Sequence, residues 1–174
     1  MAFAALTMSQ CVKNDESSSI SGGNHNNDSI ADTSEYVDLG LISLTLWKNA
    51  NEKKASDPSN DFYTYDEAIA AFGNNLPTME QFLELKQSCE WRWVDAGYYI
   101  VIGPNKNYIL LPAAGFYDCM GDFCYPRFYG FYWSSTPAGS TKAWYLNFYS
   151  NDVYMYKDKR CYANSVRLVK NCIN

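Results

Sequence analysis

The sequence has a single histidine, His25, and it stands in the polar stretch between residues 12 and 34. A Ser-His-Asp or Cys-His nucleophilic system needs an imidazole that a folded shell holds in place. A zinc site rich in histidine is excluded for the same reason. The scarcity of histidine therefore removes two large classes of catalytic chemistry, and we expect His25 to be a solvated linker residue.

Long apolar runs and concentrated positive charge are also missing. No stretch after residue 34 has the about 18 consecutive apolar residues that a membrane-spanning helix needs. The formal net charge is −5 and no basic stripe is present, which argues against nucleic acid as a partner. Aromatic residues, by contrast, make up 17% of the chain and include 15 tyrosines. Tyrosine has a polar end, so this composition favours surfaces that bind ligands or partners.

The first eleven residues, "MAFAALTMSQC", are apolar and end in a cysteine. We predict that residues 1–11 are a truncated lipoprotein signal with Cys11 as the lipid acceptor, although no Lys or Arg precedes the apolar run. Residues 12–34 are rich in Ser, Asn, Asp and Gly and are predicted to be a flexible linker. The expected product is a lipid-anchored domain, residues 35–174, in the cell envelope as an outer-membrane lipoprotein. The alternative is a frayed tail with an incidental cysteine.

The remaining five cysteines are Cys89, Cys119, Cys124, Cys161 and Cys172. In an oxidising compartment some of them pair. A disulfide between Cys119 and Cys124 would close a small loop, and two buried free thiols are the alternative. An odd number leaves one thiol over, and because neither a C-x-x-C motif nor metal-ligand spacing is present, we expect no metal site.

Two helices are predicted early in the domain. Residues 64–75 begin with a capping box of Thr64 and Glu67 and stop at Gly73. A second helix follows Pro77, where Thr78 and Gln81 repeat the capping pattern.

Strands are predicted on both sides of these helices. Residues 35–47 alternate apolar and polar positions and indicate a strand, and residues 98–112 indicate a hairpin around "GPNKN". Residues 113–131 are a loop rich in glycine and aromatics, followed by short strands in "YWSST", "KAWYLNFYS", "VYMYKDK" and "NSVRLVK". The predicted fold class is α+β, with two helices packed on a mainly antiparallel sheet and a long loop region.

Several landmarks occur in a characteristic order between residues 35 and 170: "EYVDLGL", "LW", "LPTMEQFLEL", "CEWRW", "LLPAAG", "YWSST", "AWYLNF" and "SVRLV". They resemble the Fibrobacter succinogenes major paralogous domain, a family common in lipoproteins of Bacteroides-type bacteria. That resemblance implies a C-type-lectin-like fold in which the first and last strands pair beside the two helices. It also implies one interior that brings together Trp47, Trp133 and Val166. The insert that family members carry after the first "LW" is short here.

Catalytic chemistry finds little support in the sequence. Calcium-dependent sugar binding needs a cluster of oxygen ligands, and "GPN" at 103–105 and "SND" at 150–152 lack the acidic member of lectin motifs. The related formylglycine-generating enzymes use a late cysteine pair with a metal, but the surroundings of Cys161 and Cys172 do not match. A glycosidase needs two spaced carboxylates, and Asp118, Asp122 and Asp152 are expected to be turn formers. We therefore expect no enzyme activity and no cofactor.

The loop "FYDCMGDFCYPRFYGF" is the candidate recognition surface. Tyr and Arg are typical of interface hot spots and of sugar stacking. The predicted ligand-binding residues are Tyr117, Asp118, Asp122, Tyr125, Arg127, Phe128 and Tyr129. We expect Trp133 to be a packing residue and Arg167 to brace the sheet or a carboxylate. The predicted function is non-catalytic recognition of a carbohydrate or a protein at the cell surface; the alternative is a structural or adhesin subunit without a soluble ligand.

Overall fold

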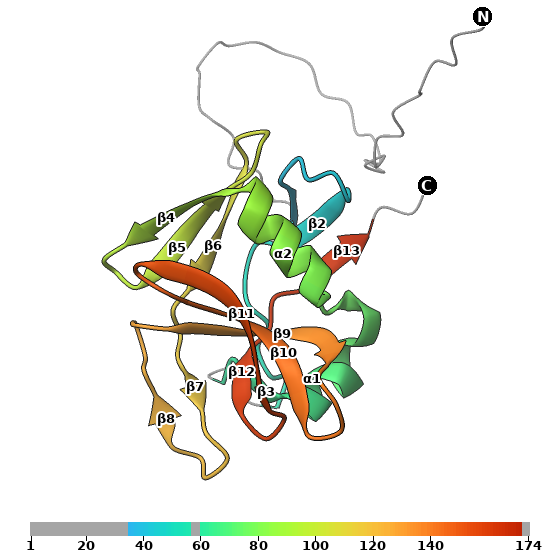
Figure 1. The fold of residues 1–174 in the computed structure, drawn as a ribbon, viewed down its shortest axis with the longest axis vertical. Helices are drawn as coiled ribbons and strands as arrows, with labels where there is room; N and C mark the ends of the chain where they lie inside the picture. The colour runs from blue at the N-terminus through green and yellow to red at the C-terminus, as the bar shows by residue number, and fades with distance from the viewer. Residues whose placement is uncertain (1–34, 57–59, 172–174) are drawn as a thin grey trace, which may run out of the picture.

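The structure, a computed structural model, describes residues 35–56 and 60–171, and it is mostly β. Strands hold 46% of these residues and helices only 16%, in three sheets and two short helices (Figure 1). The predicted two-helix α+β, C-type-lectin-like class is therefore wrong. The helices are too short to form a layer, and a curled mixed sheet dominates the molecule.

The opening and closing segments of the domain share one antiparallel sheet in the order β1–β2–β13. It consists of β1 (Tyr36–Asp38), β2 (Thr45–Lys48) and β13 (Val169–Asn171), and Val169 lies opposite Trp47. The expected pairing of the two ends is confirmed. The single strand expected over residues 35–47 is two strands, because Gly40 and Leu44 adopt φ values of 71° and 57° that turn the chain back.

Both helices begin where their capping boxes predict. The Thr64 side chain accepts a hydrogen bond from the Glu67 backbone N–H at the start of α1 (Tyr65–Phe72), and Glu67 caps Thr64 in return. Thr78 and Gln81 do the same for α2 (Met79–Ser88). Gly73, with φ 50°, ends α1 and opens a 3₁₀ turn, η1 (Gly73–Asn75).

The predicted hairpin at residues 98–112 is confirmed as part of a second antiparallel sheet. This sheet contains β4 (Glu90–Val94), β5 (Tyr98–Ile102) and β6 (Tyr108–Pro112). Gly103 leads into the turn at a point where a Cβ would collide with the Leu39 carbonyl. Only glycine allows this close approach between the hairpin and the first sheet.

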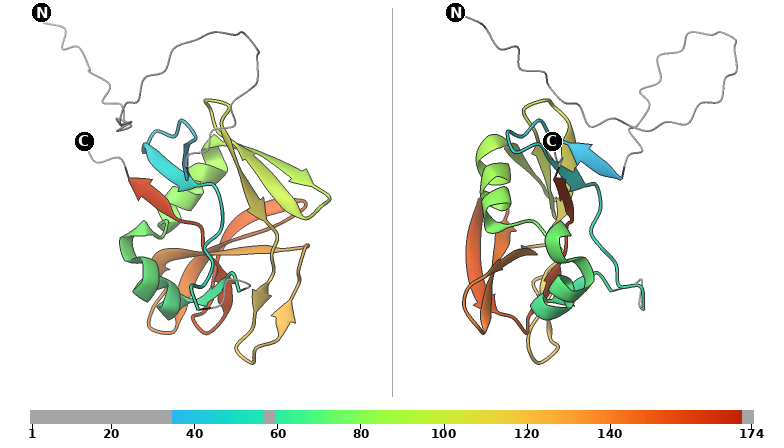
Figure 2. Two further views of the ribbon diagram at one scale, coloured as in Figure 1. Left: turned by 180° about the vertical axis from the view of Figure 1, so that it is seen from behind. Right: turned by 90° about the vertical axis from the view of Figure 1, so that its right-hand side faces the viewer.

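The largest sheet has seven strands and carries the aromatic part of the sequence. Its main path is β11 (Asp152–Lys159), β10 (Lys142–Tyr149), β9 (Gly130–Pro137), β12 (Ala163–Ser165), β7 (Phe116–Tyr117) and β8 (Phe123–Cys124), and β3 (Phe62–Thr64) pairs with β12. One pairing, β9 with β12, is parallel. Along the molecule, sheet β4–β5–β6 and the β7–β8 hairpin lie toward opposite ends (Figure 2).

The two faces of the large sheet pack into two separate hydrophobic clusters. Tyr132 and Phe148 belong to the first, with α2 and Trp47, whose ring centroid lies 5.3 Å from that of Phe82. Trp133 and Val166 belong to the second, with α1. The expectation of a single interior is therefore wrong, because alternate residues of β9 face opposite sides of the sheet.

Trp133 and Arg167 are structural residues, as expected. Trp133 is fully buried, and its Nε1–H donates to the Tyr63 carbonyl at 2.9 Å. Arg167 is also buried, and its guanidinium braces three elements. Its Nε and Nη2 atoms both donate to Oδ1 of Asn51, at 3.0 and 2.7 Å. Its Nη1 donates to the Lys48 carbonyl at 2.9 Å, and Nη2 also donates to the Leu110 carbonyl at 2.7 Å. Backbone and amide oxygens, not a carboxylate, thus accept the hydrogen bonds of this side chain.

Candidate functional site

The side chains of β11 differ in type between the two faces of the large sheet. Tyr154 and Tyr156 lie on one face with Asp152 and Asp158, while Val153 and Met155 pack into the first cluster on the other. On β10, Tyr145 lies opposite Tyr156, and their ring centroids are 6.0 Å apart. The outer face of β10–β11 is therefore built from tyrosines.

The loop after β8 extends this surface. Tyr129 contacts Tyr149 of β10, with centroids 5.5 Å apart, and Tyr125 contacts Tyr129 at 5.2 Å. Tyr125 also stacks on Phe116 at 6.3 Å. We call the resulting surface the tyrosine face: Tyr125, Tyr129, Tyr149, Tyr154 and Tyr156.

Half-buried and buried rings support the tyrosine face from below. Phe131 contacts Tyr129 and Tyr145, with centroids at 6.2 and 5.8 Å. Phe116 lies 4.6 Å from Phe131. Each ring of the tyrosine face therefore contacts at least one other aromatic ring.

The hydroxyl groups of this face differ from those of three buried tyrosines, which bind within the fold. Tyr65, Tyr99 and Tyr132 donate their O–H groups to the carbonyls of Ser135, Tyr149 and Pro112 at 2.8–3.0 Å. The five hydroxyls of the tyrosine face have no hydrogen-bond partner within residues 35–56 and 60–171. They remain available to a bound molecule.

Burial and neighbouring groups disfavour ionisation of Tyr154 and of Tyr145 beside it. Burial, with the neighbouring Tyr149, Tyr129, Asp152 and Tyr156, raises the pKa of Tyr154. Burial, with Asp158 as the next cause, raises the pKa of Tyr145 far above its usual range. Tyr154 and Tyr145 are therefore held as neutral phenols, which act as hydrogen-bond donors and acceptors.

The predicted ligand residues divide between two sides of the β7–β8 hairpin. Tyr125 and Tyr129 belong to the tyrosine face, and Phe128, 68% exposed, lies in the same loop. Arg127 is exposed beside them in a left-handed conformation, and its backbone N–H donates to the Ala113 carbonyl at 2.7 Å. Tyr117, Asp118 and Asp122 belong elsewhere, because Tyr117 points to the opposite side of β7 from Phe116.

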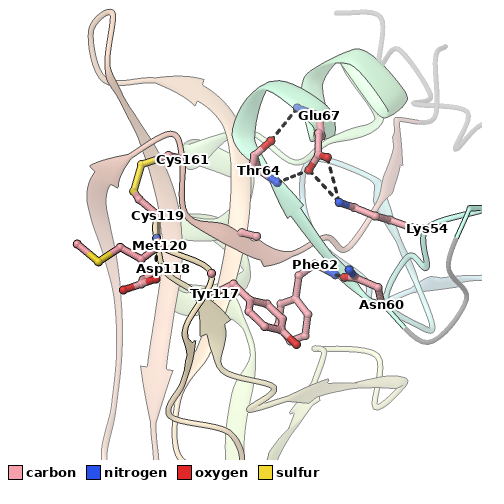
Figure 3. Close-up of a pocket in the computed structure, with 12 residues that line it drawn as sticks. Lys54, Asn60, Phe62, Thr64, Glu67, Tyr117, Asp118, Cys119, Met120 and Cys161 are labelled. Carbon is pink, nitrogen blue, oxygen red and sulfur yellow. Dashed lines mark hydrogen bonds and ion pairs between the residues drawn. A yellow bond between two sulfur atoms is a disulfide. The ribbon is translucent and has the colours of Figure 1, made fainter.

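Tyr117 and Asp118 line a pocket of about 360 Å³ between the β7–β8 turn, β3 and the start of α1 (Figure 3). The Phe62 and Tyr117 rings meet edge to face at 5.2 Å in its wall. Lys54 closes another side through a 3.0 Å ion pair with Glu67. Since Glu67 also caps α1, the charged groups of this pocket already have partners.

Asp118 forms the turn of the hairpin, as turn chemistry predicts for an aspartate in a loop. Its Oδ1 accepts hydrogen bonds from the backbone N–H groups of Met120 and Asp122 at 2.8 and 2.9 Å. These backbone bonds, that from Asp122 first, hold the pKa of Asp118 below its usual range. This environment suits a structural carboxylate and not a general acid.

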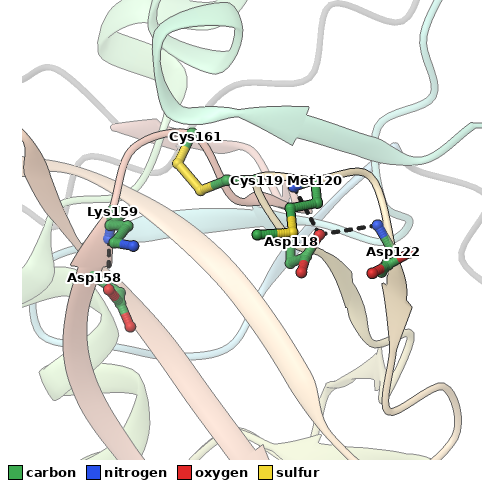
Figure 4. Close-up of a disulfide and its surroundings, with 7 residues drawn as sticks. All are labelled: Asp118, Cys119, Met120, Asp122, Asp158, Lys159 and Cys161. Carbon is green, nitrogen blue, oxygen red and sulfur yellow. Dashed lines mark hydrogen bonds between the residues drawn. A yellow bond between two sulfur atoms is a disulfide. The ribbon is translucent and has the colours of Figure 1, made fainter.

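The disulfide predicted between Cys119 and Cys124 is wrong. Cys119 pairs with Cys161, 42 residues later, and their Cα atoms are 5.2 Å apart (Figure 4). The bond ties the β7–β8 turn to the turn between β11 and β12. The hairpin leads Cys124 back along β8 opposite Phe116, away from the turn that contains Cys119.

The free thiols within the described residues have raised pKa values. Burial raises the pKa of Cys89 to about 11, with a smaller effect from Glu84. Burial, then Asp118 and Asp122, raises that of Cys124. Neither thiol is activated as a nucleophile. The predictions for Cys11, His25 and Cys172 lie outside the described residues.

Sequence reasoning missed Tyr149, Tyr154 and Tyr156 as candidate binding residues. The signal was present in "YSNDVYMY", where tyrosines two positions apart fall on the same face of a predicted strand. What the sequence did not reveal is that this face lies beside the loop of Tyr125 and Tyr129.

Metal-ligand clusters and membrane-spanning helices are absent from the part of the chain that the structure describes. Residues 35–56 and 60–171 contain no group of three or more His, Cys, Asp or Glu side chains that could hold a metal ion. Within the same ranges, neither helix has the length and apolar character needed to cross a bilayer.

Comparison with known proteins adds one similarity. Residues 103–169, from the β5–β6 turn to the start of β13, match a domain of unknown function, DUF8237. No curated protein and no solved structure matches the chain. The matched region contains the whole tyrosine face together with Trp133 and Arg167.

Proposed function

We propose that this protein is a non-catalytic recognition module that binds a carbohydrate polymer on the tyrosine face. The observation that carries the proposal is the set of five neighbouring tyrosines on one side of the molecule, each with its hydroxyl unbonded within the described residues. The buried tyrosines Tyr65, Tyr99 and Tyr132 use their hydroxyls to bind backbone carbonyls within the fold, whereas these five do not.

A sugar ring has an apolar C–H face and a polar edge of hydroxyl groups. A tyrosine matches both, because its ring offers a flat apolar surface and its O–H donates and accepts. Tyrosine is also typical of protein-binding hot spots, but these gain much of their affinity from anchors buried in pockets. The pocket beside β3 and α1 contains none of the five tyrosines of this face. These features favour carbohydrate over protein as the ligand.

The surface is suited to binding without turnover. The nearby carboxylates Asp152 and Asp158 accept backbone N–H bonds from Val153 and Lys159, at 2.7 and 2.8 Å, as turn and strand-end residues do. The free thiols Cys89 and Cys124 carry raised pKa values. Neither set supplies the poised acid, base or nucleophile that hydrolysis or oxidation requires.

We further propose that the protein acts outside the cytoplasm, as a lipoprotein anchored through Cys11 to the cell envelope. The Cys119–Cys161 disulfide supports this location, because such bonds persist in oxidising compartments. A tether of residues 12–34 would place the tyrosine face away from the membrane surface.

The test is a glycan array and a polysaccharide pull-down with the full chain and with Tyr154→Ala/Tyr156→Ala. Loss of two stacking residues is expected to weaken binding at least tenfold, at about 1 kcal/mol or more for each ring. Tyr108→Ala is the matched control, because Tyr108 is 58% exposed on β6 and Tyr156 is 52% exposed.

Replacement of Tyr154 and Tyr156 by phenylalanine keeps both rings and removes only the hydroxyl groups. An intermediate loss of binding is expected. Equal binding by a correctly folded Tyr154→Ala/Tyr156→Ala protein would eliminate the tyrosine face as the site. If these substitutions instead abolish self-association measured by light scattering, the face serves assembly, which is the structural-subunit alternative.

A further inference from the structure

Charges on β10 and β11 are divided between the two faces of the sheet. Asp152 and Asp158 share the tyrosine face with Tyr154 and Tyr156 by strand alternation. The lysines Lys142, Lys157 and Lys159 belong to the other face, where Lys142 lies opposite Lys159 and the Lys157 ammonium lies 5.3 Å from the Trp144 ring. The tyrosine face is therefore bounded by negative charge at both ends of β11.

The arginines nearest to the tyrosine face do not reverse its negative charge. Arg160 is engaged away from the face: its guanidinium stacks on Tyr65 at 4.7 Å and lies 3.6 Å from an oxygen of Asp66. Arg127 is exposed in the loop between Tyr125 and Tyr129 and contributes one positive charge. The two carboxylates on the sheet, Asp152 and Asp158, outweigh it.

The tyrosine face is also wider than one sugar ring. It extends over β11 and β10 to the loop that follows β8, and adjacent strands lie about 4.8 Å apart. Two such steps, from β11 to β10 and from β10 to the loop, correspond to roughly 10 Å of aromatic surface. A monosaccharide would cover only part of it, whereas a chain of sugars could contact several rings in succession.

We propose that the ligand of the tyrosine face is a neutral polysaccharide chain, and that Asp152 and Asp158 exclude glycans that carry carboxylate or sulfate groups. This inference rests on the proposed function and names the ligand class. The physical reason is repulsion: an anionic sugar on the rings would bring its charge within a Debye length, about 10 Å at 0.1 M salt, of one or both carboxylates. Neutral sugars experience no such repulsion.

The experiment measures binding of the full chain to neutral polymers (xylan, mannan and mixed-linkage glucan) and to anionic ones (polygalacturonate and heparin), at about 20 and 300 mM salt. We expect binding to at least one neutral polymer that changes less than twofold with salt. Binding to the anionic polymers is expected to be at least tenfold weaker at low salt.

The decisive variant is Asp152→Asn/Asp158→Asn, which preserves the Oδ1 atoms that accept the backbone bonds. It is expected to strengthen binding to anionic polymers about three- to tenfold at low salt, and to leave binding to neutral polymers within twofold. Glu80→Gln/Glu84→Gln is the matched control. It changes the net charge equally but lies on α2, which packs on the other face of the sheet, so no gain is expected.

Three outcomes would overturn the inference, and they separate it from the proposed function. If the native protein binds heparin or polygalacturonate as tightly as its best neutral polymer at low salt, the ligand class is wrong while the carbohydrate site stands. The same holds if the aspartate variant gains nothing, or if the Glu80/Glu84 control gains as much. If the native protein binds no polymer, or if Tyr154→Ala/Tyr156→Ala retains full binding, both proposals fail together.

Discussion

Arg167 offers the sharpest test of how the three sheets are held together. Its guanidinium donates to Asn51, Lys48 and Leu110, which lie after β2, at the end of β2 and in β6. Replacement by methionine keeps most of the volume but leaves three oxygens without their donors. Each unsatisfied buried polar group costs about 1–3 kcal/mol.

The net effect is smaller than the sum of these costs, because methionine also removes the cost of burying a charge. Burial lowers the pKa of Arg167, which reflects that cost. Three unsatisfied oxygens at about 1–3 kcal/mol each, reduced by this relief, lead us to expect a destabilisation of about 3 kcal/mol for Arg167→Met. This is a large part of the about 5–15 kcal/mol by which a domain of this size is stable.

The assay is urea unfolding followed by tryptophan fluorescence, with the free energy of unfolding taken by linear extrapolation. Arg92→Met is the control, since Arg92 forms only an exposed 2.9 Å ion pair with Glu90 and should cost under about 1 kcal/mol. Arg167→Lys keeps the charge but cannot reach all three acceptors, so an intermediate loss is expected if Arg167→Met fails to fold. A loss below about 1 kcal/mol for Arg167→Met, with an unchanged m-value, would refute the bracing role.

Two further predictions concern the disulfide and the cap of α1. Replacement of Cys119 and Cys161 by serine opens a loop with a sequence separation of 42, and should lower the free energy of unfolding by about 4 kcal/mol or less. The loss is measured from the midpoints of urea unfolding. An equal loss of stability in the Cys124→Ser control would contradict this prediction. Burial alone would raise the pKa of Glu67, but hydrogen bonds from Thr64 and Lys54 lower it overall. Glu67 therefore contributes stability above its unfolded pKa, and this contribution is lost as the pH falls through the folded value. Glu67→Gln should destabilise the protein at pH 7 by at most about 1 kcal/mol and by less at pH 3. The free energy of unfolding is measured for both proteins at both pH values. An equal loss of stability at the two pH values would show that the charge of Glu67 is not responsible.

Local signals in the sequence specified many of the elements. The capping boxes at Thr64 and Thr78 fixed the starts of both helices, because the donor and acceptor of each box lie three residues apart. The β5–β6 hairpin was equally predictable, since its turn and both strands lie within fifteen consecutive residues.

The candidate site was only half predictable. Tyr125 and Tyr129 were identified from a loop rich in Tyr and Arg, and the structure places both in the tyrosine face. Tyr154 and Tyr156 were assigned to a strand without a role, because nothing local indicates which face of a strand is covered by other elements.

The sequence by itself determined the elements whose interactions are local: helix starts, tight turns and the two-residue alternation of the strands. Only the tertiary structure decided the fold class, the division of the interior into two clusters, the pairing of Cys119 with Cys161, and the meeting of β11 with the loop after β8. These depend on contacts between residues tens of positions apart. Their free energies come from burial and from hydrogen bonds that form only when the whole chain has closed.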